Sequence, residues 1–182
     1  RLVSPRALAA VHALNALKHR YGPNPRLLAA QVRRYRDAVA AFEEAFGPGP
    51  ACMVTAAARI EVCGGHIDYV DYFQNKVLAF GSRECDMLMV FRGRSDSAVR
   101  GRSLQPGFGP ASFGLDEFPG TPSPSAEDWL AFLDSAGCPA PHWVNYVKAS
   151  AFHLAHLHPG SRLTGIDFVV DSTIPVAGGA SS

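Results

Sequence analysis

The sequence is short of three things, and each shortage excludes a class of protein. Its four cysteines contain no Cys-x-x-Cys pair, which argues against a zinc site, and four in 182 residues do not indicate a disulfide scaffold. Reduced thiols in a cytoplasmic protein are therefore predicted. The net charge of +1 argues against nucleic acid or a membrane surface as a partner. No apolar run approaches the ~18 residues that a membrane-spanning helix needs.

What is present is an ordinary globular composition, with 47% hydrophobic and 18% charged residues. A chain of this length can bury a sizeable core. Helical and extended patterns are mixed, without strict alternation and without an internal repeat. This mixture predicts an α+β domain that has a mixed, partly antiparallel sheet with helices packed on it.

Two helices are predicted at the start of the chain, over residues 4–22 and 24–47. In the second helix Asn24 is the expected N-cap and Gly47 the expected stop. The run "RRYR" places three arginines on this helix: Arg33, Arg34 and Arg36. We interpret them as a solvated outer face rather than a phosphate site, because clustered surface charge is usually solvated.

The remaining elements follow from apolar runs between breaks rich in Gly and Pro. Strands are predicted over residues 51–65, 75–82, 85–93, 97–105 and 165–175. A long surface loop is expected over 105–125. Helices are expected over 125–137, where Ser125 and Asp128 have the spacing of a capping box, and over 140–160.

Polar side chains gather at the end of the first predicted strand, in "AAARIEVCGGHIDYV". Strand alternation places Arg59 and Glu61 on one face, and the glycines that follow release His66 and Asp68 into a loop. Guanidinium, imidazole and carboxylate groups suit sugar hydroxyls or phosphate. A polar turn with an Asp cap and a half-buried His explains the same residues slightly better on chemistry alone.

The last predicted strand leads into "IPVAGGASS", which offers a second candidate site. Glycines let backbone N–H groups turn toward an anion, so Gly178 and Gly179 followed by Ser181 and Ser182 could cradle a phosphate. The stretch lacks the Lys of a Walker loop. A flexible tail explains the same composition. Because the sequence stops within this stretch, we expect the chain to be part of a longer protein.

Taken together, these stretches resemble the galactokinases of the GHMP small-molecule kinase superfamily. The stretch "AAARIEVCGGHIDY" is similar to their first signature, A-P-G-R-V-N-L-I-G-E-H-T-D-Y, and "TIPVAGGASS" to the superfamily's P-x-G-x-G-L-S-S-S. Between the two, "HWVNYVKA" resembles W-x-N-Y-V-K-G, and "FEEAFGPGP" precedes them like F-x-x-x-F-G. The order and spacing of all four agree, which is far more specific than any single motif.

The resemblance implies a fold, an activity and two ligands. It implies the GHMP kinase N-terminal domain, ribosomal protein S5 domain 2-like, over residues 38–182 and incomplete at its C-terminus, with residues 1–37 as a helical N-terminal extension. It implies an ATP-dependent sugar 1-kinase that uses Mg²⁺ and phosphorylates the anomeric hydroxyl of galactose or a related monosaccharide. The expected partners are the sugar and ATP, with no nucleic acid and no membrane, in a monomer or weak dimer.

The resemblance also assigns roles to individual residues. Arg59 corresponds to the motif arginine near the reacting end of the sugar and the catalytic carboxylate. His66 and Asp68 would hydrogen-bond sugar hydroxyls, beside Gly65. Trp143 corresponds to the tryptophan that lines the adenine pocket. The ATP phosphates would be wrapped by a loop whose serines lie near magnesium, made of Gly178, Gly179, Ala180, Ser181 and Ser182.

The sequence departs from the family pattern at several positions. Gly65 replaces a glutamate that helps to bind the C6 hydroxyl of galactose, and plant arabinokinases of the same superfamily also carry Gly-Gly here. Ala57 and Ala58 replace Pro-Gly, while Ala177 and Ala180 replace a glycine and a leucine of the phosphate loop.

These departures leave alternatives to a galactose kinase. An arabinose-type kinase and a catalytically impaired sugar or nucleotide sensor both remain open. A kinase for mevalonate or homoserine is disfavoured by the His-x-Asp-Tyr set at residues 66–69. The family's catalytic aspartate lies downstream of Ser182, so the sequence as it stands predicts no activity alone.

Overall fold

The structure is a computed structural model, and it describes residues 5–64, 76–117, 125, 127–128, 130–131, 142–158, 161 and 163–175. Two helices open the chain, α1 over Pro5–Tyr21 and α2 over Pro25–Phe46. Asn24 caps α2 as predicted, because its Oδ1 accepts hydrogen bonds from the backbone N–H groups of Arg26 and Leu27. Gly47 ends α2 with a φ of 81°, a conformation that glycine adopts at little cost.

Five strands form one mixed sheet in the order β1-β2-β5-β3-β4. The strands are β1 (Cys52–Cys63), β2 (Leu78–Gly93), β3 (Ala98–Ser103), β4 (Ala111–Gly114) and β5 (Ile166–Ser172). β3 pairs antiparallel with β4, where Val99 lies opposite Phe113, and parallel with β5, where Gly101 lies opposite Phe168. The predicted α+β class with a mixed, partly antiparallel sheet is therefore confirmed.

Two of the predicted assignments are wrong, one for a pair of strands and one for a loop. Residues 78–93 form one strand rather than the two predicted, although Gly81 and Ser82 resemble a turn. The Ser82 hydroxyl accepts hydrogen bonds from the N–H groups of Glu84 and Cys85 without ending the strand. Residues 105–125 are not entirely loop, because β4 and a 3₁₀ helix, Leu115–Glu117, lie within them. Four strand residues between Gly- and Pro-rich stretches are too few for periodicity to reveal.

The later helices agree with the prediction where the structure describes them. Ser125 and Asp128 form the predicted capping box, with Ser125 N–H bonded to the Asp128 carboxylate and Asp128 N–H to the Ser125 hydroxyl. Helix α4 covers Val144–Leu157 and buries Val144, Phe152 and Ala155. Among the described residues, no helix is long and apolar enough to cross a membrane.

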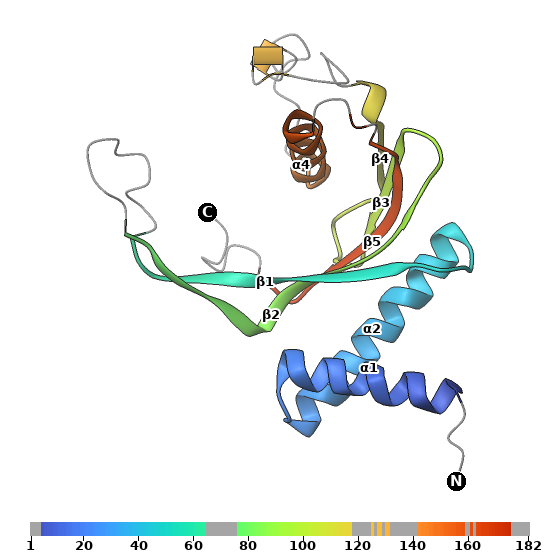
Figure 1. Ribbon diagram of the computed structural model, residues 1–182, viewed down its shortest axis with the longest axis vertical. Coiled ribbons are helices and arrows are strands. Elements are labelled where there is room, and N and C mark those ends of the chain that lie inside the picture. The colour runs from blue at the N-terminus through green and yellow to red at the C-terminus, as the bar shows by residue number, and fades with distance from the viewer. Residues whose placement is uncertain are drawn as a thin grey trace. The chain divides into compact units, whose positions relative to one another are not determined.

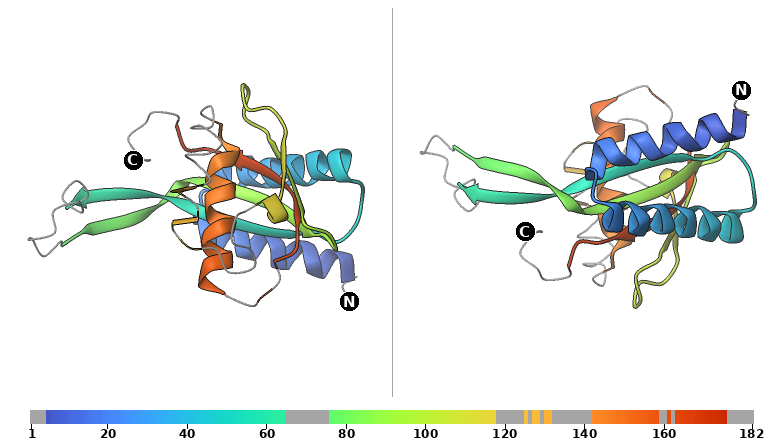
Figure 2. Two further views of the ribbon diagram at one scale, coloured as in Figure 1. Left: turned by 90° about the horizontal axis from the view of Figure 1, so that it is seen from above. Right: turned by 90° about the horizontal axis from the view of Figure 1, so that it is seen from below.

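The chain divides into two compact units. The first unit contains residues 1–41, 54–89 and 171–182, and the second contains residues 42–53 and 90–170. Within the first unit, α1 and α2 lie along the strand pair β1–β2 (Figure 2, right). Within the second unit, α4 lies against β3, β4 and β5 (Figure 1). Hence Arg59 belongs to the first unit, and Trp143 belongs to the second.

Buried side chains occur in both units. In the first they include Tyr21, Leu28, Ala38, Ala58 and Leu88. In the second they include Phe42, Val90, Val99, Phe113, Phe168 and Val169. β5 is buried from Asp167 to Val170, as expected for an inner strand of the sheet.

Candidate functional site

Arg59 lies on β1, five residues before the glycine that ends the strand. Its Nη2 pairs with Glu61 Oε1 at 2.7 Å, so the two side chains share one face of β1 as alternation predicts. The Arg59 side chain is 68% exposed. A guanidinium that is paired yet largely exposed can accept a further anionic or hydroxyl partner from solvent.

Gly64 follows directly and requires glycine for two reasons. Its φ is 93°, a region that side chains with a Cβ rarely adopt. A Cβ at this position would also collide with the carbonyl oxygen of Lys76. The backbone therefore turns at the end of β1 and passes close to the segment before β2. Gly65, His66 and Asp68 come next in the chain and lie outside the described residues.

Trp143 lies just before α4 and is half-buried. Its Nε1–H donates to the carbonyl of Gly109 at 3.0 Å, and its ring meets Phe168 edge-on at 6.0 Å between centroids. His142 stacks on the same ring at 6.0 Å. The indole is thus held in one orientation by a hydrogen bond and two ring contacts.

The end of β5 carries the chain toward the second candidate stretch. Thr173 connects this end to β2, because its N–H donates to the Asp86 carbonyl and its hydroxyl accepts from the Asp86 N–H, both at 3.0 Å. Pro175 is the last described residue. Gly178, Gly179, Ala180, Ser181 and Ser182 lie outside the described residues.

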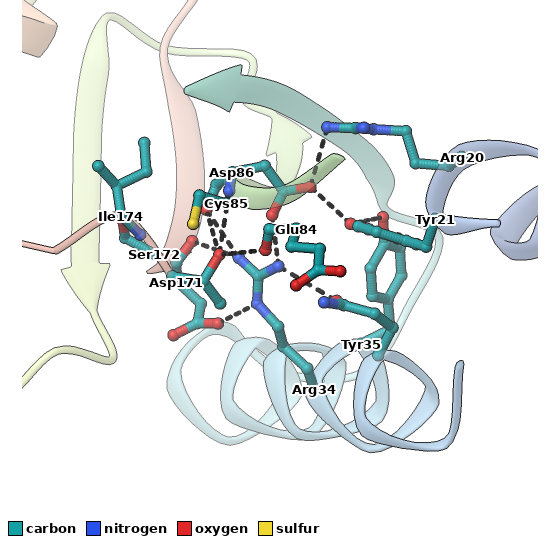
Figure 3. Close-up of polar contacts among 12 residues, drawn as sticks. Arg20, Tyr21, Arg34, Tyr35, Glu84, Cys85, Asp86, Asp171, Ser172 and Ile174 are labelled. Carbon is teal, nitrogen blue, oxygen red and sulfur yellow. Dashed lines mark hydrogen bonds and ion pairs between the residues drawn. The ribbon is translucent and has the colours of Figure 1, made fainter. Parts of the chain in front are cut away.

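A buried ion-pair network lies beside this strand end and was not predicted (Figure 3). We call it the Asp86 cluster, and its members are Arg20, Tyr21, Gln31, Arg34, Asp86 and Asp171. Asp86 on β2 is 0% exposed, and its carboxylate accepts from Arg34 Nη1, from Tyr21 Oη at 2.6 Å and from Arg20 Nη2 at 3.2 Å. Arg34 also donates from Nε to the Asp171 carboxylate.

Burial and charge within the Asp86 cluster shift the pKa values of two of its members, Tyr21 and Arg34. Burial raises the pKa of Tyr21, and the hydrogen bond to Asp86 adds to the effect, because ionisation would place a second negative charge beside that carboxylate. Burial alone would lower the pKa of Arg34. Hydrogen bonds to Asp171 and Asp86 outweigh burial, so the pKa of Arg34 is raised and its guanidinium stays positively charged.

A second carboxylate network, which we call the Asp167 cluster, contains Asp167, Arg94, Arg100 and Asp96. Asp167 accepts from Arg100 Nε at 2.7 Å and from Arg94 Nη1 at 3.1 Å, and Arg94 also pairs with Asp96. Burial alone would raise the pKa of Asp167, but the two arginines outweigh burial and lower it. The hydrogen bond from Arg94 lowers the pKa of Asp96 to about 2.

Within the described ranges, no group of three or more His, Cys, Asp or Glu side chains is arranged to hold a metal ion. Both carboxylate clusters have arginine partners instead, so their negative charge is already compensated. Neither cluster therefore has the chemistry of a metal site.

Comparison with known proteins gives three findings that agree. The galactokinase galactose-binding signature matches residues 40–78. Galactokinase of Canis lupus familiaris is 32% identical over 164 residues, which cover 85% of this chain and 33% of that protein, and galactokinase of Bos taurus is 30% identical over 161 residues with the same shares. The crystal structure of Lactococcus lactis galactokinase complexed with galactose matches 79% of this chain and 32% of that one, with a TM-score of 0.57 and 25% identity.

This chain is galactokinase-like. It is similar to the N-terminal part of a GHMP kinase, and it spans 33% of the length of the curated relatives that it matches. The matched signature contains Arg59 and Gly64 as well as the three residues expected to bind sugar.

The galactokinase-like chain carries one correction to the predicted sites. Arg33 and Arg36 are exposed as predicted, but the Arg34 side chain is only 10% exposed and belongs to the Asp86 cluster. Two signals in the sequence could have revealed this. Arg34 lies seven residues after Leu27 and four before Ala38, which places it on an apolar face of the helix, and an acidic residue stands within each apolar strand, "CDMLMV" and "FVVDS". A buried carboxylate requires a cationic partner.

Proposed function

We propose that this chain supplies the sugar-binding turn and the start of the ATP-binding loop of a galactokinase-type sugar 1-kinase. The observation that carries the proposal is the match of residues 40–78 to a galactose-binding signature, in a chain whose relatives are galactokinases. In this proposal residues 38–182 form the N-terminal GHMP-kinase domain, and residues 1–37 form an N-terminal helical extension.

The reaction would transfer the γ-phosphoryl group of ATP to the anomeric hydroxyl of the sugar. Bound ATP and Mg²⁺ would supply the phosphoryl group and part of the charge neutralisation. The residues of this chain would contribute position and charge. Arg59 would stabilise negative charge near the reacting oxygen, and its largely exposed guanidinium is suited to that role.

The sugar would be held by the turn that follows Gly64. His66 and Asp68 would hydrogen-bond its hydroxyl groups, with Gly65 beside them. The backbone turn at Gly64, which no other residue could adopt without strain, sets the direction in which the chain leaves β1 and supports this proposal.

The nucleotide would be held by two further parts of the chain. Trp143, whose orientation is restrained by Gly109 and Phe168, would contact the adenine ring. Gly178, Gly179 and Ala180 would present backbone N–H groups to the phosphates, and Ser181 and Ser182 would lie near Mg²⁺.

The test is ATP turnover by the full-length protein with galactose, arabinose and other monosaccharides, with a sugar-free reaction as the baseline. We expect transfer with at least one aldose, and loss of most of it in Arg59→Met, by about 100-fold or more for a residue that stabilises transition-state charge. Arg33→Met, which removes an exposed arginine elsewhere, is the matched control. No turnover with any sugar would overturn the enzymatic proposal.

A substitution at residue 65 tests whether this position determines the preference for galactose or arabinose. If Gly65 determines the loss of contact to the C6 hydroxyl, Gly65→Glu should raise kcat/KM for galactose relative to arabinose. A hydrogen bond to one substrate hydroxyl typically changes discrimination by about tenfold or more. An unchanged ratio would mean that the selectivity arises elsewhere.

A binding protein without catalysis is the second candidate, and it is favoured by Ala177 and Ala180 in the phosphate loop. It predicts saturable binding of sugar or ATP in calorimetry, with no phosphate transfer at high protein concentration. Any measurable transfer excludes it.

A further inference from the structure

Arg34 connects helix α2 to the end of β5. Its Nε donates to the Asp171 carboxylate, and its Nη2 donates to the Asp171 carbonyl at 3.1 Å. One side chain on α2 therefore holds both the side chain and the backbone of the residue at which β5 is about to end. In Figure 3 the guanidinium of Arg34 lies between Asp171 and Asp86.

Asp86, the second carboxylate that binds Arg34, is itself held in place by other side chains. Asp86 on β2 accepts from Arg34 Nη1 at 2.5 Å, while Tyr21 and Arg20 hold the other oxygen of the same carboxylate. The Asp86 backbone carbonyl also accepts from Arg34 Nη2 at 3.2 Å. The guanidinium thus has defined partners on two strands, which leaves it little freedom to rotate.

The backbone after Asp171 is held from β2 as well. Thr173 exchanges two hydrogen bonds with the backbone of Asp86, as described above, and its hydroxyl lies 3.2 Å from the Glu84 carbonyl. Asp171 is therefore bonded to α2 through Arg34, and Thr173 is bonded directly to β2. All of these contacts lie within one unit of the chain.

Thr173 precedes Gly178, the first glycine of the proposed ATP loop, by only five residues in the sequence. A loop that binds phosphate through backbone N–H groups needs its starting strand in one position, because an error there displaces the N–H groups that follow. A buried ion pair adds little net stability compared with apolar packing, but it can specify a unique arrangement. The network is thus better suited to fixing a geometry than to adding stability.

We propose that Arg34 is a positioning residue that fixes the end of β5 and thereby the start of the ATP loop. This inference rests on the proposed function. Arg34 does not touch the nucleotide in this proposal and acts through Asp171 and Thr173.

The test compares four variants of the full-length protein. Arg34→Leu removes every polar contact, and Arg34→Lys keeps the charge but not the forked donor set. Asp171→Asn weakens the contact to β5 and leaves Arg34 with Asp86, which keeps the test possible if Arg34→Leu does not fold. Asn24→Ala is the control, because it removes the cap of the same helix without touching β5.

Two readouts are measured on each variant. Hydrogen exchange reports the amides of residues 171–174, and we expect Arg34→Leu to accelerate it by about tenfold or more. Steady-state kinetics, with the sugar that gives the highest turnover, report how well the nucleotide is bound. We expect KM for ATP to rise by about tenfold while KM for the sugar changes by less than about twofold. Arg34→Lys should recover part of both effects, and Asp171→Asn should show smaller changes in the same direction.

The outcomes separate this inference from the proposed function. Unchanged exchange in Arg34→Leu, or equal changes in Asn24→Ala, would overturn the positioning role even if ATP is bound normally. Failure of the unsubstituted protein to bind or use ATP would overturn the proposed function and the nucleotide part of the inference. In that case hydrogen exchange alone tests whether Arg34 holds the end of β5. Unchanged exchange in Arg34→Leu would exclude that role, and accelerated exchange would support it without any link to ATP.

Discussion

The Asp86 cluster and the Asp167 cluster have the same composition at their centres, one buried carboxylate with two arginines, yet they differ in depth. Asp86 and Arg34 are 0% and 10% exposed, whereas Arg100, a main partner of Asp167, is 45% exposed. Tyr21 adds a buried hydroxyl to the first cluster. In the second cluster Arg94 has an exposed alternative partner in Asp96.

The two clusters therefore differ in how easily water can replace a lost partner. In the Asp86 cluster Asp86, Tyr21 and Arg34 are largely shielded from water, so water cannot readily replace one of them if it is lost. In the Asp167 cluster solvent reaches the arginines and can hydrate them if a contact is lost. We therefore expect the first cluster to decide how the helices and strands of its unit are joined, and the second to contribute less.

The largest expected effect tests the two central carboxylates directly. Asp86→Asn removes a buried charge that compensates Arg34, and we expect a loss of about 3–5 kcal/mol in the free energy of unfolding. Asp167→Asn leaves arginines that solvent can reach, and we expect only about 1–2 kcal/mol. Urea denaturation of both variants measures the comparison. Equal losses would show that depth does not distinguish the clusters.

A smaller effect is expected from the hydroxyl that only the Asp86 cluster contains. Tyr21→Phe removes a hydrogen bond to a buried carboxylate, which should cost about 1.5–3 kcal/mol. Because the pKa of folded Tyr21 is raised, its contribution to stability is complete below the unfolded pKa of about 10 and is lost as the pH rises above it.

Denaturation midpoints measured from pH 8 to 11 test this expectation. Tyr21→Phe should lose less stability over that range than the unsubstituted protein does. Tyr146→Phe, at a tyrosine that is 80% exposed, should behave like the unsubstituted protein and is the control. A parallel decline in all three would contradict the role given to Tyr21.

The smallest effect is expected from acid titration of the Asp167 cluster. The pKa of Asp167 is lowered in the folded protein. Its contribution to the free energy of unfolding is therefore present above the unfolded pKa of about 3.9 and is lost as the pH falls toward the folded pKa. Asp167→Asn should flatten the decline in stability between about pH 5 and 3. Asp37→Asn, which removes an exposed carboxylate from α2, should leave the decline unchanged. If Asp167→Asn leaves it unchanged too, the lowered pKa contributes nothing to folding.

Local features of the fold could be predicted well from the sequence. The Asn24 cap, the stop at Gly47 and the capping box of Ser125 and Asp128 all depend on groups within a few residues of each other. β4 could not be predicted, because its four residues are defined by pairing with β3 rather than by their own pattern. The continuity of β2 through Gly81 and Ser82 was missed for a related reason, since strand pairing overrides a weak turn signal.

The candidate site divides in the same way. Similarity to the galactokinases was recognisable from motifs, and Arg59 pairs with Glu61 on one face of β1 as strand alternation requires. The Asp86 cluster was not recognisable, and Arg34 was assigned to the solvent together with its neighbours. Its helical position indicated burial, but no local rule names partners that lie far away in the sequence.

The cap and the stop of α2 and the glycine turn after β1 could be inferred from the chain alone, because each is set by residues close together in the sequence, and the similarity to galactokinases was visible in short motifs. Which arginine of "RRYR" is a surface charge and which is buried between two strands depends on the folded arrangement. Arg34 meets Asp86 across 52 residues and Asp171 across 137. The charge of one side chain is a local property, whereas its burial and its partners exist only after distant strands have been brought beside the helix.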